Sequence, residues 1–329
     1  MVKKSNNIIK ETNLNIIRNE MKKAKMATKP QLAELTKISL VTVNALMKEL
    51  IETSEVIEDS VIQPQLGRPA TLYKYNAEYS LALVIYMYEK NKMDVVNFSV
   101  CNLYGEVINT LHNEIESITL EKIDLIISNL LNQYPNIKTI GFGVPGVEVD
   151  DQLIISDYAV FQDTKLSCYI ENKFKKPVFV ENDVNAAVVG YCYNHLEQKD
   201  KCVIGLYFPS KYAPGAGIYI NGRLVKGCKG LAGEIKFLPL GINWDTFDHE
   251  IEKVNDVIVK VMKTFMCLYN PDTIVLYQEK SECDYLSKLH DICATSMEKM
   301  MIPEIIVSDK LNNDFENGMI CLALERLEQ

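Results

Sequence analysis

The sequence predicts an α/β protein in which a small winged helix-turn-helix head precedes a larger body of two similar α/β halves. Three short helical patterns lie within the first 50 residues, and only three residues separate the second from the third. Beyond residue 77, β-rich runs alternate with amphipathic helical patterns, and each half of this region begins with β-rich runs joined by turns. A length of 329 residues accommodates two or three domains.

The helical patterns of the head carry clear start signals. The first covers about residues 13–22, with apolar residues at helical spacing. The second covers residues 31–35 and is preceded by Thr28, which forms with Gln31 the T-x-x-Q pattern of a capping box. The third begins at Ser39 and ends near residue 50. Its predicted apolar stripe consists of Leu40, Val43, Leu46, Met47 and Leu50.

The opposite face of the third helix carries short polar or small side chains and one lysine. Such side chains can approach base edges in the major groove of DNA, and the lysine can reach a phosphate. A Gly67-Arg68-Pro69 loop between two β-rich runs is typical of a wing whose arginine contacts a minor groove or the phosphate backbone. The predicted DNA-contacting residues are Ser39, Thr42, Asn44, Ala45, Lys48 and Arg68.

A head of this kind has an alternative interpretation, because a helical packing module that touches no DNA has the same helix spacing. The Gly-Arg-Pro loop favours the DNA-binding interpretation. Lys48 is the only basic residue of the predicted recognition helix, and Glu49 stands beside it. Phosphate contacts supply much of the affinity for DNA, so we expect dimerisation and the wing to strengthen binding.

The charge distribution agrees with a head that faces DNA. The whole chain has a net charge of −9. Residues 1–75 hold 12 basic and 8 acidic residues, a balance of +4, whereas the remainder holds 23 basic and 36 acidic residues, a balance of −13. A basic end on an acidic body presents one region to phosphates and repels them elsewhere.

Composition excludes several classes of protein. With 47% hydrophobic and 24% charged residues the chain is not disordered. No apolar run approaches the roughly 20 residues of a membrane helix, and the start of the chain lacks the apolar core of a secretory signal. The nine cysteines are scattered without a C-x-x-C pair. We therefore expect a cytoplasmic protein with neither a disulfide framework nor a metal site.

Five segments of the chain carry a family resemblance. They are the Gly67-Arg68-Pro69 loop, GFGVPGVEVD (141–150), ENDVNAA (181–187), INGRLVKGCKGLAGEI (220–235) and NPDTIVL (270–276). In this order they resemble the ROK family (repressors, open reading frames and sugar kinases) over essentially the whole chain. The resemblance implies a duplicated actin-like ATPase (ribonuclease H-like) fold, with a head over residues 1–76 and body halves over 77–195 and 196–329. The DNA-binding head marks the regulator branch of that family.

The resemblance also implies that kinase activity has been lost. Asp183 matches the catalytic base of the kinases, and Asn182 and Glu234 match groups that hydrogen-bond sugar hydroxyls. The phosphate-binding glycines are missing, however, from residues 84–95 and 277–280, and Pro214 removes a backbone donor from the second phosphate loop. The zinc-binding histidine and cysteines have no counterpart, and only 35 residues separate Glu234 from Asn270. We therefore expect no enzyme activity, no cofactor and no zinc.

Asn182, Asp183 and Glu234 keep two interpretations. They are either a residual pocket for a sugar or sugar-phosphate effector or structural residues, since an Asn-Asp pair after a strand is a good helix cap. The leading hypothesis for the whole chain is a transcriptional regulator, a repressor linked to carbohydrate metabolism, that binds an operator in double-stranded DNA as a homodimer. A sugar-sensing or interaction scaffold without DNA binding and, last, an ATP-dependent sugar kinase are the alternatives.

Overall fold

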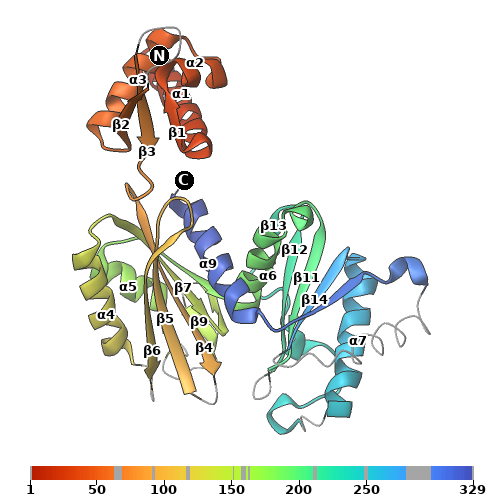
Figure 1. Ribbon diagram of the computed structural model, residues 1–329. Coiled ribbons are helices and arrows are strands. Elements are labelled where there is room, and N and C mark those ends of the chain that lie inside the picture. The colour runs from red at the N-terminus through yellow and green to blue at the C-terminus, as the bar shows by residue number, and fades with distance from the viewer. Residues whose placement is uncertain are drawn as a thin grey trace. The chain divides into compact units, whose positions relative to one another are not determined.

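The protein divides into two compact units. The computed structural model describes residues 2–62, 69–90, 93–115, 119–150, 152–156, 161, 164–209, 213–247, 251–278 and 298–327. The first unit is Met1–Leu81 together with Asn102–Glu106, and the second is Ala82–Cys101 together with Val107–Gln329. The units share no β-sheet, and Figure 1 shows their elements.

Three helices form the first unit's core: α1 (Val2–Ala24), α2 (Lys29–Thr36) and α3 (Leu40–Glu52). Helix α1 begins well before residue 13, although the sequence pattern predicted that residue as its start. Its sequence holds neither proline nor glycine, so nothing in the added turns opposes a helix. The Thr12 hydroxyl also donates to the Ile8 carbonyl within these turns, at 2.9 Å.

The predicted starts of α2 and α3 are confirmed. The Thr28 backbone N–H donates to the Gln31 side chain at 2.8 Å, and the Gln31 N–H donates back to the Thr28 hydroxyl at 3.4 Å, which completes the capping box. The Ser39 hydroxyl accepts the Thr42 N–H at 3.2 Å at the start of α3. Lys37 takes the left-handed conformation between the two helices, at φ 58°.

The stripe predicted for α3 is buried except at its first member. Val43, Leu46, Met47 and Leu50 are buried, but Leu40 is 45% exposed. Side chains of a helix tilt toward its N-terminus, so the side chain of the first helical residue extends past the part of the helix that packs. The residues of α1 and α2 buried in this unit are Leu14, Ile17, Met21 and Leu32.

A three-stranded antiparallel sheet completes the first unit. Its strands are β1 (Met26–Thr28), β2 (Val56–Ile62) and β3 (Ala70–Tyr75), in the order β1-β3-β2. The sequence pattern indicated β2 and β3 but not the short β1. Gly67 and Arg68, in the connection between β2 and β3, lie outside the described residues.

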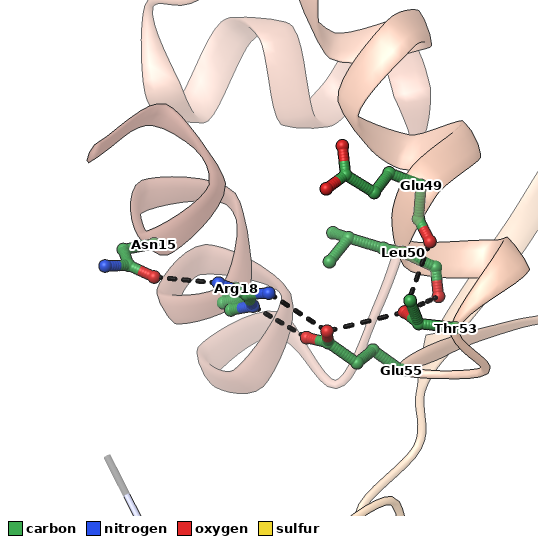
Figure 2. Close-up of polar contacts among 6 residues, drawn as sticks. All are labelled: Asn15, Arg18, Glu49, Leu50, Thr53 and Glu55. Carbon is green, nitrogen blue, oxygen red and sulfur yellow. Dashed lines mark hydrogen bonds and ion pairs between the residues drawn. The ribbon is translucent and has the colours of Figure 1, made fainter. Parts of the chain in front are cut away.

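An ion pair fastens α1 to the segment that joins α3 to β2. Arg18 donates to both carboxylate oxygens of Glu55, from Nε at 2.6 Å and from Nη2 at 3.0 Å, as Figure 2 shows. The Asn15 side chain accepts a further bond from Arg18, and the Thr53 hydroxyl lies 3.4 Å from Glu55. The Glu55 side chain is only 7% exposed. A bidentate arginine–carboxylate pair is geometrically specific, so it fixes where β2 begins.

The second unit contains two five-stranded sheets with the same plan. The first has the order β10-β7-β4-β5-β6, with β4, β5 and β6 in an antiparallel meander and β10 parallel to β7. The second has the order β13-β12-β11-β14-β15, with an antiparallel meander of β11, β12 and β13 and with β14 and β15 parallel. The predicted α/β fold with a duplicated body is therefore confirmed.

The two sheets consist of short strands, and β15, at the edge of the second sheet, had no counterpart among the predicted β-rich runs. Those of the first sheet are β4 (Leu81–Lys90), β5 (Met93–Cys101), β6 (Val107–Ile115), β7 (Ile137–Val144) and β10 (Val178–Asn182). Those of the second sheet are β11 (Cys202–Tyr207), β12 (Gly215–Ile220), β13 (Arg223–Leu224), β14 (Thr273–Tyr277) and β15 (Glu304–Ser308). A separate hairpin pairs β8 (Gly146–Val149) with β9 (Gln152–Ser156).

The helices of this unit also occur at matching places. They are α4 (Leu120–Gln133), α5 (Leu166–Phe174), α6 (Asp183–Asn194), α7 (Ile251–Tyr269) and α9 (Leu311–Leu327). Helices α4 and α7 precede the first parallel strand of their sheets, and α6 and α9 follow the last strand. Short 3-10 turns are η1 (Leu196–Gln198), η2 (Ile235–Phe237), η3 (Trp244–Thr246) and η4 (Lys299–Met301).

Helices α6 and α9 pack against each other and each also packs against the other half's sheet. Helix α6 lies against β11 and β12, and α9 lies against β7. The two helix backbones meet at two glycines: a Cβ built on Gly190 would lie 1.9 Å from the Asp314 carbonyl oxygen, and one on Gly318 would lie 1.8 Å from that of Ala186. Only glycine permits this approach.

A buried polar cluster stands beside this contact. The Tyr277 hydroxyl lies 3.0 Å from Oδ2 of Asp314 and 3.3 Å from the Ala187 carbonyl, and the Asn194 amide donates to Oδ1 of Asp314 at 3.3 Å. Burial raises the pKa of Asp314. The cluster joins the end of β14 to both α6 and α9, since these partners come from all three elements.

Replacing Glu55 with alanine tests the ion pair of the first unit. Glu55→Ala leaves the partly buried Arg18 without its carboxylate, and we expect a loss of about 2 kcal/mol in the free energy of unfolding of this unit. Glu49→Ala is the matched control, because Glu49 pairs with Lys10 and both side chains are well exposed, at 40% and 46%. A solvent-exposed pair contributes much less than a buried one, because water screens the two charges. Denaturant unfolding measures both, and equal losses would contradict the assignment.

Replacing Gly190 with alanine tests the helix crossing. Gly190→Ala places a methyl group on the Asp314 carbonyl, so the helices must separate, and we expect the second unit to lose about 3 kcal/mol or more. The control is Gly205→Ala in β11, where the new Cβ would meet the Val188 side chain at 3.2 Å. A shift of a few tenths of an ångström relieves a contact at 3.2 Å but not one at 1.9 Å with a backbone oxygen, so the midpoint of urea unfolding should fall much further for Gly190→Ala. Similar midpoints would argue against the crossing.

Candidate functional site

The outward face of α3 presents most of the residues predicted to contact DNA. Asn44, Ala45 and Lys48 are exposed and lie on one side of the helix. Ser39 and Thr42 differ from them, because their hydroxyl oxygens lie 2.9 Å apart within the helix cap and Thr42 is half-buried. Arg68 lies outside the described residues, and the neighbouring Pro69 is exposed.

Lys48 keeps its charge available to solvent. Its Nζ lies 3.8 Å from Oε1 of Glu52, and the two side chains are 78% and 66% exposed. An exposed pair of this kind is worth little and is easily exchanged for a phosphate partner. Sequence reasoning missed Val41, which is 80% exposed on the same side of the helix. Its position three residues before Asn44 was the signal that could have found it.

The candidate effector residues Asn182 and Asp183 stand where β10 passes into α6. The Asn182 side-chain oxygen accepts the N–H groups of Val184 and Asn185, at 3.0 and 3.1 Å, and its amide donates to the Gly146 carbonyl at 3.3 Å. Asn182 therefore caps α6, as its structural interpretation predicted. The Asp183 carboxylate accepts the Val184 N–H at 2.8 Å and is half-buried.

A buried carboxylate beside this cap was not singled out from the sequence. Glu181 is 5% exposed and forms an ion pair with Lys226. It also accepts the Asn185 amide at 3.2 Å and the Asn182 backbone N–H at 3.1 Å. Lys226 follows β13 and Glu181 belongs to β10, so this pair links the two halves of the second unit.

Glu234 approaches the same end of α6 through β12. The Ala216 N–H donates to the carbonyl of Gly233 at 3.0 Å, which fixes the segment before Glu234 against β12, and β12 packs on α6. Burial raises the pKa of Glu234, and Lys236, at 4.0 Å, opposes the rise. Half-buried carboxylates and amides of this kind are the groups that hydrogen-bond hydroxyl-rich ligands in pockets.

The parts expected for phosphate transfer are only partly described. Pro214 is buried just before β12, whereas residues 91–92, 210–212 and 279–280 of the three expected phosphate segments lie outside the described residues. In place of the expected glycines, Tyr277 fills the space beside α6 and α9. Among the residues that the structure describes, no three or more His, Cys, Asp or Glu side chains gather as a metal site would need.

The described helices give one further constraint. None of them combines the length and the apolar character needed to cross a membrane.

The shifted pKa of Glu234 predicts a pH dependence. Because the folded state raises this pKa, the protonated form is favoured on folding. The protonated Glu234 carboxyl therefore stabilises the folded state fully when the pH is below the pKa of this group in the unfolded chain. This stabilisation is lost as the pH rises through the higher pKa of the folded state. The Glu234→Gln variant does not lose stability in this way, because a glutamine amide does not ionise. We expect the stability of Glu234→Gln relative to the unmodified protein to improve as the pH rises above about 4.3, the ordinary pKa of a glutamate. Glu298→Gln, at an exposed position, is the control. Parallel pH profiles of all three proteins would contradict the burial of Glu234.

Three comparisons place these features among known proteins. The model of the ROK family matches residues 90–248. The xylose repressor of Bacillus subtilis (strain 168) is 25% identical over 247 residues, which cover 71% of this chain. The match spans 62% of the length of that repressor.

Solved structures support the fold over most of the chain. A ROK family transcriptional regulator, a homolog of the E. coli MLC protein, superposes with a TM-score of 0.64 at 17% identity, covering 97% of this chain and 99% of that one. A ROK family glucokinase from Streptomyces griseus, in complex with glucose and AMPPNP, superposes with a TM-score of 0.53 at 15% identity, covering 75% of this chain and 100% of that one.

Proposed function

Because the chain contains a ROK family domain, we propose that it is a DNA-binding transcriptional regulator, a repressor linked to carbohydrate metabolism. The observation that carries the proposal is the exposed face of α3, on a helix whose start is fixed by the Ser39 cap and whose opposite side is buried. Similarity to xylose repressors supports it. The regulator with the MLC-like fold, which extends over 97% of this chain, supports it as well.

In this proposal the head, residues 1–76, is a winged helix-turn-helix and α3 is its recognition helix. Its N-terminal residues face base edges in the major groove, Lys48 contacts a phosphate, and Arg68 between β2 and β3 contacts the minor groove or the backbone. The body is residues 77–195 and 196–329. A cytoplasmic homodimer would place two heads on a pseudo-palindromic operator, because half-sites repeat with the symmetry of the protein.

The body senses a sugar or sugar phosphate and has no kinase activity in this proposal. Asp183 and Glu234, at the start of α6 and beside β12, supply acceptors for sugar hydroxyls, while Asn182 remains a helix cap. The Tyr277 side chain, packed where the resemblance expects glycines, argues against a phosphate site. An effector would act by binding one arrangement of the body better than another and thereby changing the affinity for the operator.

Binding of the full-length chain to DNA tests the proposal. We expect saturable, sequence-selective binding to operators recovered by site selection, measured by fluorescence anisotropy at two salt concentrations. Lys48→Ala should lower the affinity uniformly across sequences and reduce the slope of log K against log salt by about two, because each of the two heads of the homodimer loses one phosphate contact. Lys138→Ala, at an exposed position of the body, is the matched control and should leave the slope unchanged.

The same titration examines the effector. Addition of xylose or of another sugar from a panel should shift the operator affinity of the unmodified protein, and Glu234→Gln should weaken that shift. Absence of sequence preference would reject the regulator and leave a scaffold. Turnover of ATP with any sugar would reject the loss of kinase activity.

A further inference from the structure

One stripe of α3 faces away from the core of the first unit. Val41, Asn44, Ala45 and Lys48 follow one another at spacings of three, one and three residues, and all four are exposed. The buried residues of the helix occupy the other side. The first member of the stripe is an apolar side chain that is 80% exposed, whereas the rest are polar or small. A valine so exposed at the start of this helix has no packing role in the unit.

The residues that flank Val41 are engaged in the helix cap. The Ser39 hydroxyl accepts the Thr42 N–H at 3.2 Å and lies 2.9 Å from the Thr42 hydroxyl. Hydroxyl groups that already bond within a cap have little remaining capacity to select a base. At the N-terminal end of the recognition helix, where base edges are contacted, Val41 is the most exposed apolar side chain, well ahead of Leu40.

We propose that Val41 contacts the C5-methyl group of a thymine in the operator, an inference that rests on the proposed regulator function. In the major groove thymine is the base that presents a methyl group to an apolar side chain. Placed against a purine N7 or a cytosine amine, valine would leave a polar group desolvated without a partner. The chemistry of the side chain therefore selects thymine among the four bases.

The position of Asn44 on the same stripe indicates which base pair lies next to the thymine that Val41 contacts. Three residues of helix advance by about 4.5 Å, which is close to the rise of about 3.4 Å per base pair. Val41 and Asn44 therefore reach neighbouring base pairs when α3 lies along the groove. An asparagine amide pairs with the N6 and N7 atoms of adenine. The operator half-site should then contain two neighbouring A·T pairs, one read by its thymine methyl and the other by its adenine.

Substitution of thymine by deoxyuridine tests the contact, because it removes only the methyl group. Full-length protein would be titrated with selected operators in which each thymine of one half-site is replaced in turn. For the unmodified protein we expect one position at which affinity falls about fourfold, the effect of one buried methyl group. Val41→Ala should bind the unsubstituted operator more weakly and show no further loss at that position. The two changes would then be non-additive, as expected for groups in contact.

Val107→Ala is the matched control, since Val107 is an exposed valine of β6, outside the first unit. It should retain the full sensitivity to deoxyuridine. Sequence-selective binding with a deoxyuridine effect that persists in Val41→Ala, or with no such effect at any thymine, would overturn the role of Val41 and leave the regulator function standing. Recovery of no preferred sequence at all would overturn both.

Discussion

The contact between Gly190 of α6 and Gly318 of α9 is the constraint on which the second unit depends. Each glycine has a carbonyl oxygen of the other helix where a Cβ would stand, so the two backbones touch directly. This approach lets α6 reach β11 and β12 and lets α9 reach β7. The two halves of the second unit are thus joined because the last helix of each half packs on the sheet of the other half. The Glu181–Lys226 ion pair adds a second connection between them.

Tyr277 shows how the same junction bears on function. It is wholly buried, with its hydroxyl directed to Asp314 and the Ala187 carbonyl. A side chain of this size occupies space that a glycine would leave open. Three partners from α6, β14 and α9 hold one another in place there. Under the proposed regulator function, this packed junction leaves less room for a phosphate than glycines would.

Local signals in the sequence predicted local structure well. The Thr28–Gln31 box, the Ser39 cap and the buried face of α3 are formed by residues within one or two helical turns of each other. Strand β1, the pairing of Glu181 with Lys226, and the exposure of Leu40 depend on partners far along the chain or on where packing stops. The periodicity of apolar residues in a sequence does not indicate partners that lie far apart along the chain. The candidate effector residues illustrate both cases, since the cap at Asn182 was foreseeable and the partial burial of Glu234 beside β12 was not.

The exchange of α6 and α9 also sets the order in which the chain can mature during synthesis. The first body half reaches β10 and α6 by residue 194, yet α6 has its packing surface on strands that follow residue 201, and β7 receives α9 only after residue 311. A nascent chain that has emerged as far as α7 would expose the apolar surfaces meant for these helices. Apolar surfaces exposed in this way are the ones through which incomplete chains aggregate.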